Sequence, residues 1–426
     1  MIERPTELVR SIQFIVGGDH ITEDPAIQID GSRPRLIARP ACAREVAECL
    51  KVCSDYDAAV VPAGRMTWLE WGNPLKRVDV VISLERMRRI VHFSPPDLTA
   101  TVDAGLTLNE FSAASVRDRQ WLPFDPPGLE SASLGAIAAC NSSGALRLGF
   151  GTPRDYVIGL KLAHADGTES KSGGQVVKNV AGYDMNKLYV GSYGTLAIIT
   201  ELTFKLRPLA ERISTMMIKS KSRGQLFDLA RRVLASELQP ASVVFARRLP
   251  LSLSSGCLDD ALFIRFINSE AAVEHQVDWV TRALDDTSFG TVLTPGEADA
   301  VWAEVADFDK QDVRVRISVP LSTVSAEFEK ALLAHLEFAA TADVGAGIIR
   351  MAFDADAVSA VDKIKRLRAS AAAANGALVI ERAPAEVRSQ SDAWGDIGST
   401  AGLMRGIKSS FDPKGLLNPG KFVLGI

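Results

Sequence analysis

The stretch SASLGAIAACNSSGALRLGFG, residues 131–151, decides the fold because it joins a helix start to a run of very small residues. Ser133 is suited to cap a helix whose first turn, Leu134 to Ala136, is nearly bare backbone. Its free N–H groups and the positive end of the helix dipole favour an anion such as pyrophosphate. The small residues that follow let a large flat ligand approach the main chain. Taken alone, the pattern is equally typical of a tight helix crossing.

Three other segments also contain glycine or proline at positions typical of loops. VVPAGRMTWLEWGNP, residues 60–74, begins as a buried strand and continues like a phosphate-wrapping loop, with Arg65 and Met66 where glycines are expected. KNVAGYDMNKLYVGSYGTLAIITE, from Lys178, has a glycine at each turn, which is also typical of two turns bounding a strand. LPFDPPG, from Leu122, has two prolines that favour a rigid, extended wall or a simple linker.

Length and composition indicate a globular protein with two domains. The chain has 426 residues, 47% apolar and 23% charged, and its net charge of −4 gives no electrostatic case for nucleic acid or an anionic membrane as a partner. No apolar run approaches the roughly 20 residues of a membrane span. We therefore expect a cytoplasmic protein that meets a membrane only through partners. The five cysteines form no C-x-x-C pair, so we expect neither an iron–sulfur nor a zinc site.

The rhythm of strands and helices predicts an α+β protein in three segments. Residues 1–208 combine short strands and helices with glycine loops. Residues 209–383 contain strand-like runs separated by amphipathic helices near 223–236, 270–284, 324–338 and 356–374, which favours an antiparallel sheet with helices on one face. Residues 384–426 again contain turns with Gly and Pro, and we expect them to pack back on the first segment.

These motifs in this order resemble a known family. PxGxxT at 62–67, LPFDPP, SLGAIAACNSSG, VKNVAGYDMNKLYVGSYGTLAIITE and the tail FDPKGLLNPGKF resemble the vanillyl-alcohol-oxidase (PCMH-type) FAD-linked oxidases. Within that family the chain is most similar to the second FAD-binding (E) subunits of bacterial glycolate oxidases. The resemblance covers most of residues 30–208 and 384–426. It implies a two-part FAD-binding domain with an inserted ferredoxin-like α+β domain.

The resemblance also implies which positions bind FAD. The first loop would hold the pyrophosphate through Pro62, Gly64, Arg65, Met66 and Thr67. The body of the FAD would be lined by Pro126, Pro127, Ser133, Leu134, Gly135, Ser143 and Gly144. Its adenine end would lie by Gly194, Ile198 and Thr200, and its flavin ring near Asn418 and Lys421.

Main-chain groups do much of this binding, so side chains in the first loop are free to vary. Arg65 and Met66 are compatible with the loop if their φ angles stay negative. Some members of the family attach FAD covalently through a His in this loop. No His lies between His20 and His92, so we expect non-covalent FAD.

The catalytic 2-hydroxy acid dehydrogenases of this family carry a His-rich GHxGDGNxH stretch that binds a divalent metal. Its counterpart here, ADVGAGIIR, has Asp343 and Arg350 where the histidines would be, so we expect no metal site. Arg316 and Arg350 lie on predicted strands and are candidates to clamp a carboxylate, with Arg314 on the same face as Arg316. Salt bridges are the more typical use of such arginines. Tyr183, in a loop that the family places near the flavin, is equally suited to a structural hydrogen bond.

Three functions remain open from the sequence. The first is a FAD-binding flavoprotein subunit of a glycolate-oxidase-like (2-hydroxy acid dehydrogenase) complex, with a sister FAD-linked dehydrogenase subunit and an iron–sulfur subunit as partners. The second is a stand-alone flavin-dependent oxidase or dehydrogenase of a small hydroxy acid or alcohol. The third is a structural subunit without FAD, which the altered first loop keeps open. The first two make the chain a FAD-dependent oxidoreductase.

Overall fold

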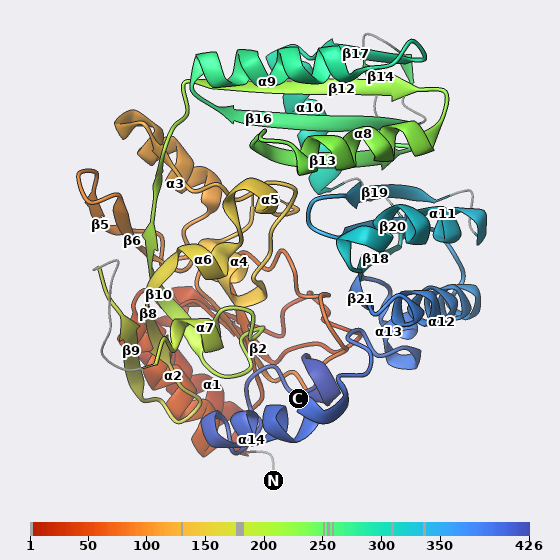
Figure 1. Ribbon diagram of the computed structural model, residues 1–426. Coiled ribbons are helices and arrows are strands. Elements are labelled where there is room, and N and C mark those ends of the chain that lie inside the picture. Colours follow the sequence, from red (N-terminus) through yellow and green to blue (C-terminus); the bar gives the residue numbers. More distant parts are fainter. Residues whose placement is uncertain are drawn as a thin grey trace.

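The structure, a computed structural model, describes residues 3–128, 131–175, 183–249, 252–253, 256–257, 260–307, 311–334 and 338–426. Figure 1 shows two parts, an N-terminal domain that carries both ends of the chain and a cap domain built from residues 212–382. No helix in these described ranges is both long and apolar enough to cross a membrane.

The N-terminal domain begins with a small mixed sheet. Its order is β1-β2-β4-β3, and β4 pairs in parallel with both β2 and β3. The strands are β1 (Ile21–Glu23), β2 (Leu36–Ala38), β3 (Val60–Ala63) and β4 (Val80–Ser83). Helices α1 (Glu3–Val16) and α2 (Ala43–Asp55) pack beside it, because each has an apolar stripe at helical spacing. Cys49 and Cys53 lie in that buried stripe, as small apolar residues.

A second, antiparallel sheet completes the domain, with the order β5-β6-β10-β8-β9. Its strands are β5 (Ile90–Ser94), β6 (Thr99–Asp103), β8 (Val157–Ala163), β9 (Glu169–Gly173) and β10 (Ile198–Lys205). Helix α2 also contacts β8 and β10, so one helix links the two sheets.

Short helices connect the strands of the N-terminal domain, and one of them begins at the predicted Ser133 cap. Thr107 and Glu110 form a capping box at α3 (Leu108–Ser115), and the Ser133 hydroxyl accepts a hydrogen bond from Ala136 N at α4 (Leu134–Cys140). The remaining short elements are β7 (Gln120–Trp121), α5 (Arg147–Phe150), α6 (Pro153–Tyr156), α7 (Asn186–Tyr189) and β11 (Arg207–Pro208).

The cap contains one eight-stranded antiparallel sheet with the order β17-β12-β16-β13-β19-β20-β18-β21. The first four-strand unit is β12 (Arg212–Ser220), α8 (Arg223–Ala235), β13 (Pro240–Arg247), β16 (Asp260–Asn268), α9 (Glu270–Ala283) and β17 (Ser288–Val292). The second is β18 (Val313–Ser318), α11 (Val324–Ala334), β19 (Ala339–Asp343), β20 (Ile348–Phe353), α12 (Ala357–Ala373) and β21 (Ala377–Arg382). Each unit is a ferredoxin-like βαββαβ motif, and the two join where β13 pairs with β19.

The predicted cap sheet is confirmed, but its helices do not all lie on one face. Helices α8, α9, α11 and α12 share one apolar core, whereas α10 (Pro295–Ala306) packs on the other face through Trp302. The indole N–H of Trp302 donates to the Thr215 hydroxyl at 2.9 Å. Alternation along β12 places Met216 in the first core and Met217 in the second. Residues 252–253 and 256–257 form the small hairpin β14–β15.

The last segment returns to the N-terminal domain, as predicted. Helix α13 (Ala385–Gln390) still packs on the cap, where Val387 belongs to the cap core. After it, α14 (Ala401–Phe411) and the tail lie along the N-terminal domain (Figure 1). Val60 N donates to Leu416 O at 2.8 Å and Asn418 N to Val60 O at 2.9 Å, so the tail runs parallel to β3.

Three phenylalanines hold the centre of the cap core. The rings of Phe227 and Phe245 stack with centroids 4.8 Å apart, and Phe328 meets Phe245 edge-on at 5.1 Å. We expect Phe245→Ala to lower the free energy of unfolding by about 3–5 kcal/mol, because it leaves a cavity at a fully buried site. Urea denaturation followed by tryptophan fluorescence measures the loss. Phe289→Ala, at a 64% exposed site on β17, is the matched control and should change stability little; equal losses in the two variants would contradict this account of the core.

Candidate functional site

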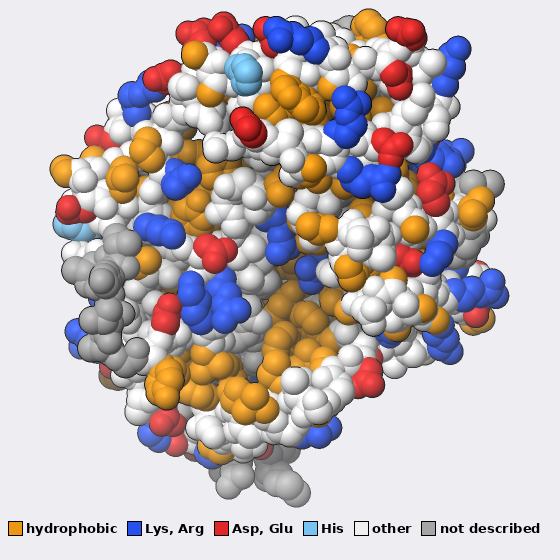
Figure 2. Space-filling model, viewed as in Figure 1, with side chains coloured by type: hydrophobic (Ala, Val, Ile, Leu, Met, Phe, Trp, Pro, Cys, Tyr) orange, Lys and Arg blue, Asp and Glu red, His pale blue; other side chains and the backbone are white. Residues whose placement is uncertain are grey.

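A cleft of about 810 Å³ runs along the carboxyl end of β3, where the first loop, the start of α4 and residues 193–199 meet. In Figure 2 hydrophobic side chains gather in the hollow between the N-terminal domain and the cap, beside a few Lys or Arg side chains. Much of the cleft wall is backbone or small side chains, because three of the predicted glycine-rich segments converge on it.

The structure brings together most of the residues expected to hold the cofactor. The first cleft is lined by Pro62, Gly64, Arg65, Met66, Thr67, Ser133, Gly135, Gly194, Ile198, Asn418 and Lys421. Pro127 and Ser143 line a second cleft beside it. Pro126, Leu134, Gly144 and Thr200 line neither cleft.

The residues outside both clefts have structural roles instead. Leu134 is buried in the core of the N-terminal domain, and the Thr200 hydroxyl donates to Lys161 O at 3.2 Å. Gly144 N donates to the carboxylate of Asp125 at 2.9 Å, and a Cβ at Gly144 would lie 2.2 Å from Asp125 O. The first part of the predicted loop from Lys178, residues 178–182, lies outside the described residues.

The expectation of negative φ angles is wrong for Met66. Met66 has φ 59°, in the left-handed region where glycine is favoured, whereas Arg65 is not among the residues with positive φ. The Met66 side chain packs against a small apolar cluster that includes Val61 and Leu75. That contact offsets the conformational cost, so the loop keeps a glycine-like path without a glycine.

Two buried polar atoms at the cleft indicate a missing partner. Arg65 Nε and Asn418 Oδ1 have no hydrogen-bond partner among the described residues, although both side chains line the first cleft. Gly64 has no room for a side chain, because a Cβ there would lie 2.0 Å from the Ser133 hydroxyl. A ligand with acceptor oxygens and a polar ring edge, as in FAD, matches both atoms, so the residues present fit that cofactor.

Sequence reasoning missed the aromatic residues of the cleft. Trp68 and Trp71 line it and stack on each other, with ring centroids 4.7 Å apart. Tyr193 lines both clefts, and its φ of 56° is unusual for an aromatic residue. Its ring stacks on Phe422 at 5.5 Å and meets Trp394 edge-on at 4.7 Å. Burial raises the pKa of the Tyr193 phenol well above its usual value, so the phenol stays protonated.

The second cleft, of about 490 Å³, lies where the cap faces the N-terminal domain. Arg316 on β18 stands directly opposite Arg350 on β20, a like-charge pair that sheets normally avoid. The Glu381 carboxylate on β21 lies between them, 3.3 Å from the Nε of each. Burial raises the pKa of Glu381, but Arg350, Arg314 and Arg316 outweigh that effect and hold it below the usual value.

A third arginine of the same cleft comes from the N-terminal domain. Burial first, and then the charges of Arg316 and Arg350, lower the pKa of Arg147. Three guanidinium groups therefore face this cleft with one carboxylate among them. Such an excess of positive charge attracts a small anion.

The other catalytic candidates lie elsewhere. Arg314 is 2% exposed and paired with Asp307 and Glu381, so it does not line the second cleft beside Arg316. Tyr183 is 96% exposed and lines neither cleft. Asp343 is buried at the end of β19, and burial raises its pKa to about 7 against the opposing charges of Arg350 and Arg147. Within the described ranges, no group of three or more His, Cys, Asp or Glu side chains is arranged to hold a metal ion.

Comparison with known proteins relates parts of the chain to FAD-binding proteins. Residues 34–173 match the model of a FAD binding domain, and residues 397–422 match the C-terminal domain of FAD linked oxidases. The chain is 32% identical over 214 residues to glycolate oxidase subunit GlcD of Bacillus subtilis (strain 168), which covers 50% of this chain and 46% of GlcD. It is 34% identical over 189 residues to glycolate oxidase subunit GlcE of Escherichia coli (strain K12), which covers 44% of this chain and 50% of GlcE.

Each of these two alignments therefore spans half or less of the relative's own length. The solved structure of p-cresol methylhydroxylase with substrate bound has the same fold, with a TM-score of 0.76 at 14% identity over 99% of this chain and 97% of that chain. The loop-built cleft, the two domain matches and this shared fold agree with one another. Residues 34–173 and 397–422 therefore match domains of FAD-linked oxidases, and the chain shares the fold of p-cresol methylhydroxylase.

Proposed function

We propose that this chain is a flavoprotein subunit of a glycolate-oxidase-like complex and holds FAD without a covalent bond. The observation that carries the proposal is the first cleft, where Arg65 and Asn418 each leave a buried polar atom for a ligand. Both domain matches and the similarity to GlcD and GlcE support it. The first loop contains no His, which supports non-covalent attachment.

Each wall of the first cleft has a distinct task in this proposal. FAD, when bound, supplies a group that accepts a hydride from a substrate. The Arg65 guanidinium provides positive charge for a phosphate, while Glu110, 3.2 Å away, fixes the guanidinium on its other side. Gly64 keeps the loop against Ser133, and the stacked Trp68 and Trp71 close the apolar side and exclude water.

The partners are a sister FAD-linked 2-hydroxy acid dehydrogenase subunit and an iron–sulfur subunit, with the complex in the cytoplasm. In the segment that corresponds to the His-rich metal stretch, Asp343 is buried near the charges of Arg350 and Arg147, and Arg350 pairs with Glu381. The substrate oxidation that such a metal supports would then occur on the sister subunit. Similarity to GlcE, which is named as a subunit, favours this division of labour.

An absorbance spectrum of the purified chain tests this proposal. We expect a yellow protein whose flavin is released into the supernatant by acid precipitation, because no covalent bond retains it. The protein alone should leave glycolate unoxidised and gain activity when the two partner subunits are added. A colourless protein that takes up no added FAD would support a purely structural subunit instead. Flavin that stays in the acid precipitate would contradict non-covalent binding.

A second function is favoured by the arginines of the second cleft. A cleft with Arg147, Arg316 and Arg350 beside the cofactor cleft is suited to a small hydroxy acid, whose carboxylate would be attracted by the positive charge that Glu381 leaves unbalanced. The Tyr193 phenol, protonated at neutral pH, would donate a hydrogen bond to the ligand from the border of the two clefts. In this case the chain would oxidise a small hydroxy acid by itself.

An anaerobic panel of hydroxy acids distinguishes the two functions. If the chain acts alone, one acid should bleach its flavin absorbance, and Arg350→Met should weaken binding of that acid by roughly ten- to a hundredfold through loss of a charge-assisted contact. Arg366→Met is the matched control, because Arg366 lies on the outer face of α12 paired with Asp362. If no acid bleaches the flavin, the stand-alone function is ruled out and the subunit function is retained.

A further inference from the structure

The C-terminal segment 408–421 contacts two loops that line the first cleft, the first loop (residues 60–74) and the loop that begins at residue 193. Lys408 Nζ donates to Thr195 O at 2.8 Å and Leu417 O at 2.9 Å, and it pairs with Asp412 at 2.7 Å. Ten residues later, Asn418 Nδ2 donates to Tyr193 O at 2.7 Å. These bonds fix the carbonyls of residues 193–195, so the segment determines the path of the loop that forms one wall of the cleft.

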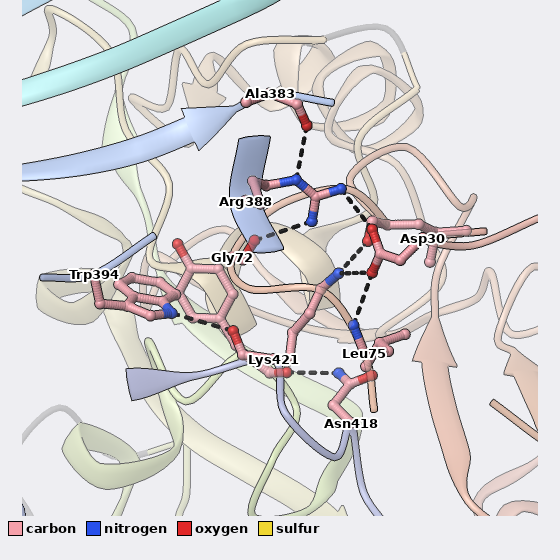
Figure 3. Close-up of polar contacts among 10 residues, drawn as sticks. Asp30, Gly72, Leu75, Ala383, Arg388, Trp394, Asn418 and Lys421 are labelled. Carbon is pink, nitrogen blue, oxygen red and sulfur yellow. Dashed lines mark hydrogen bonds and ion pairs between the residues drawn. The ribbon is translucent and has the colours of Figure 1, made fainter. Parts of the chain in front are cut away.

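Lys421 makes the corresponding contact with the first loop. Its ammonium donates to Leu69 O and lies 3.3 Å from the Asp30 carboxylate, in a residue that is 5% exposed (Figure 3). Its own carbonyl accepts from Asn73 N at 2.9 Å and from the Trp394 indole at 3.1 Å. One residue therefore holds the first loop at two points, Leu69 and Asn73.

Asp30 connects Lys421 to helix α13, which packs on the cap. Arg388 of α13 donates to the other oxygen of Asp30 at 2.5 Å, to Gly72 O at 3.1 Å and to Ala383 O at 2.7 Å (Figure 3). Burial raises the pKa of Asp30, but the charges of Lys421 and Arg388 more than reverse that, so Asp30 is ionised. Two cations share one carboxylate, so the group carries an excess positive charge, and Lys421 is the cation of this group that lines the first cleft.

We propose that residues 408–421 form a clasp that sets both cofactor loops in their binding geometry, and that Lys421 is its main positioning residue. This inference rests on the proposed function only in taking FAD as the ligand of the first cleft. A loop whose carbonyls are already fixed loses less freedom when a ligand binds, so its N–H groups bind more tightly. The excess charge of Lys421 adds attraction for a negatively charged cofactor.

The clasp predicts a specific loss when Lys421 is changed. Lys421→Met should weaken FAD binding by about tenfold or more, because a buried charge-assisted hydrogen bond is lost. FAD titration followed by quenching of flavin fluorescence gives the dissociation constant, and near-ultraviolet circular dichroism checks folding. Lys414→Met is the matched control, because Lys414 lies in the same segment but donates to Ser54, away from both loops. Equal FAD affinity in these two variants would overturn the clasp.

The pH profile separates this role from general stabilisation. Burial, reinforced by the charge of Arg388, lowers the pKa of Lys421 to about 8. Asp30 and Cys140 also face Lys421, and both act to raise its pKa. FAD affinity should therefore fall above about pH 8 in the wild type and hold in Lys421→Arg, which stays charged. Between pH 8 and 10.5 the Lys421 side chain binds more protons in the unfolded chain than in the folded protein, so its contribution to the free energy of unfolding rises with pH. Unfolding therefore does not explain the loss of FAD affinity.

The outcomes distinguish the clasp from the proposed function. Identical pH profiles for wild type and Lys421→Arg would overturn the clasp, even if Lys421→Met failed to fold. A wild-type protein that takes up no FAD at any pH would overturn both the proposed function and the clasp. A wild-type protein that binds FAD no more tightly than Lys421→Met would overturn the clasp alone.

Discussion

The buried carboxylate of Asp30 is the interaction on which the arrangement of the domains depends. It accepts a hydrogen bond from Leu75 N, just after the first loop. It also pairs with Arg388, after the cap, and with Lys421 in the tail. A buried charge of this kind is costly unless its partners are held in place, and here three distant parts of the chain supply them. The position of the cap beside the N-terminal domain and the closure of the tail thus share one electrostatic origin.

The two halves of the cap sheet are used differently, although they have the same topology. The cap residues of the second cleft, Arg316, Arg350 and Glu381 among them, all come from the second βαββαβ unit. The first unit extends that sheet through β13 and contributes the stacked Phe227 and Phe245 to the core that both units share. Glu381, 3.3 Å from the Nε of both Arg316 and Arg350, lets the second unit hold these opposed arginines.

Local sequence patterns predicted many elements of this molecule, but they carry no information about its long-range contacts. The Ser133 cap and the antiparallel sheet of the cap follow from local patterns, so they appear where expected. Met66 has a left-handed backbone because its side chain meets a cluster assembled from other segments, which no local pattern reports. The importance of Asp30 is hidden for the same reason, since its charged partners, Arg388 and Lys421, lie more than 350 residues away along the chain. Tyr193 resembles any residue of a glycine turn until the fold places it between two clefts.

The tail that runs beside β3 has a consequence for biosynthesis. Strand β3 is made early, but its neighbour at residues 416–418 leaves the ribosome only after the whole cap has been translated. Because domains fold as the chain emerges, the N-terminal domain must wait with an open edge while the cap folds independently. The cofactor cleft is therefore completed last, and a nascent chain interrupted before Lys421 would present the loops of a flavoprotein without the contacts that close them.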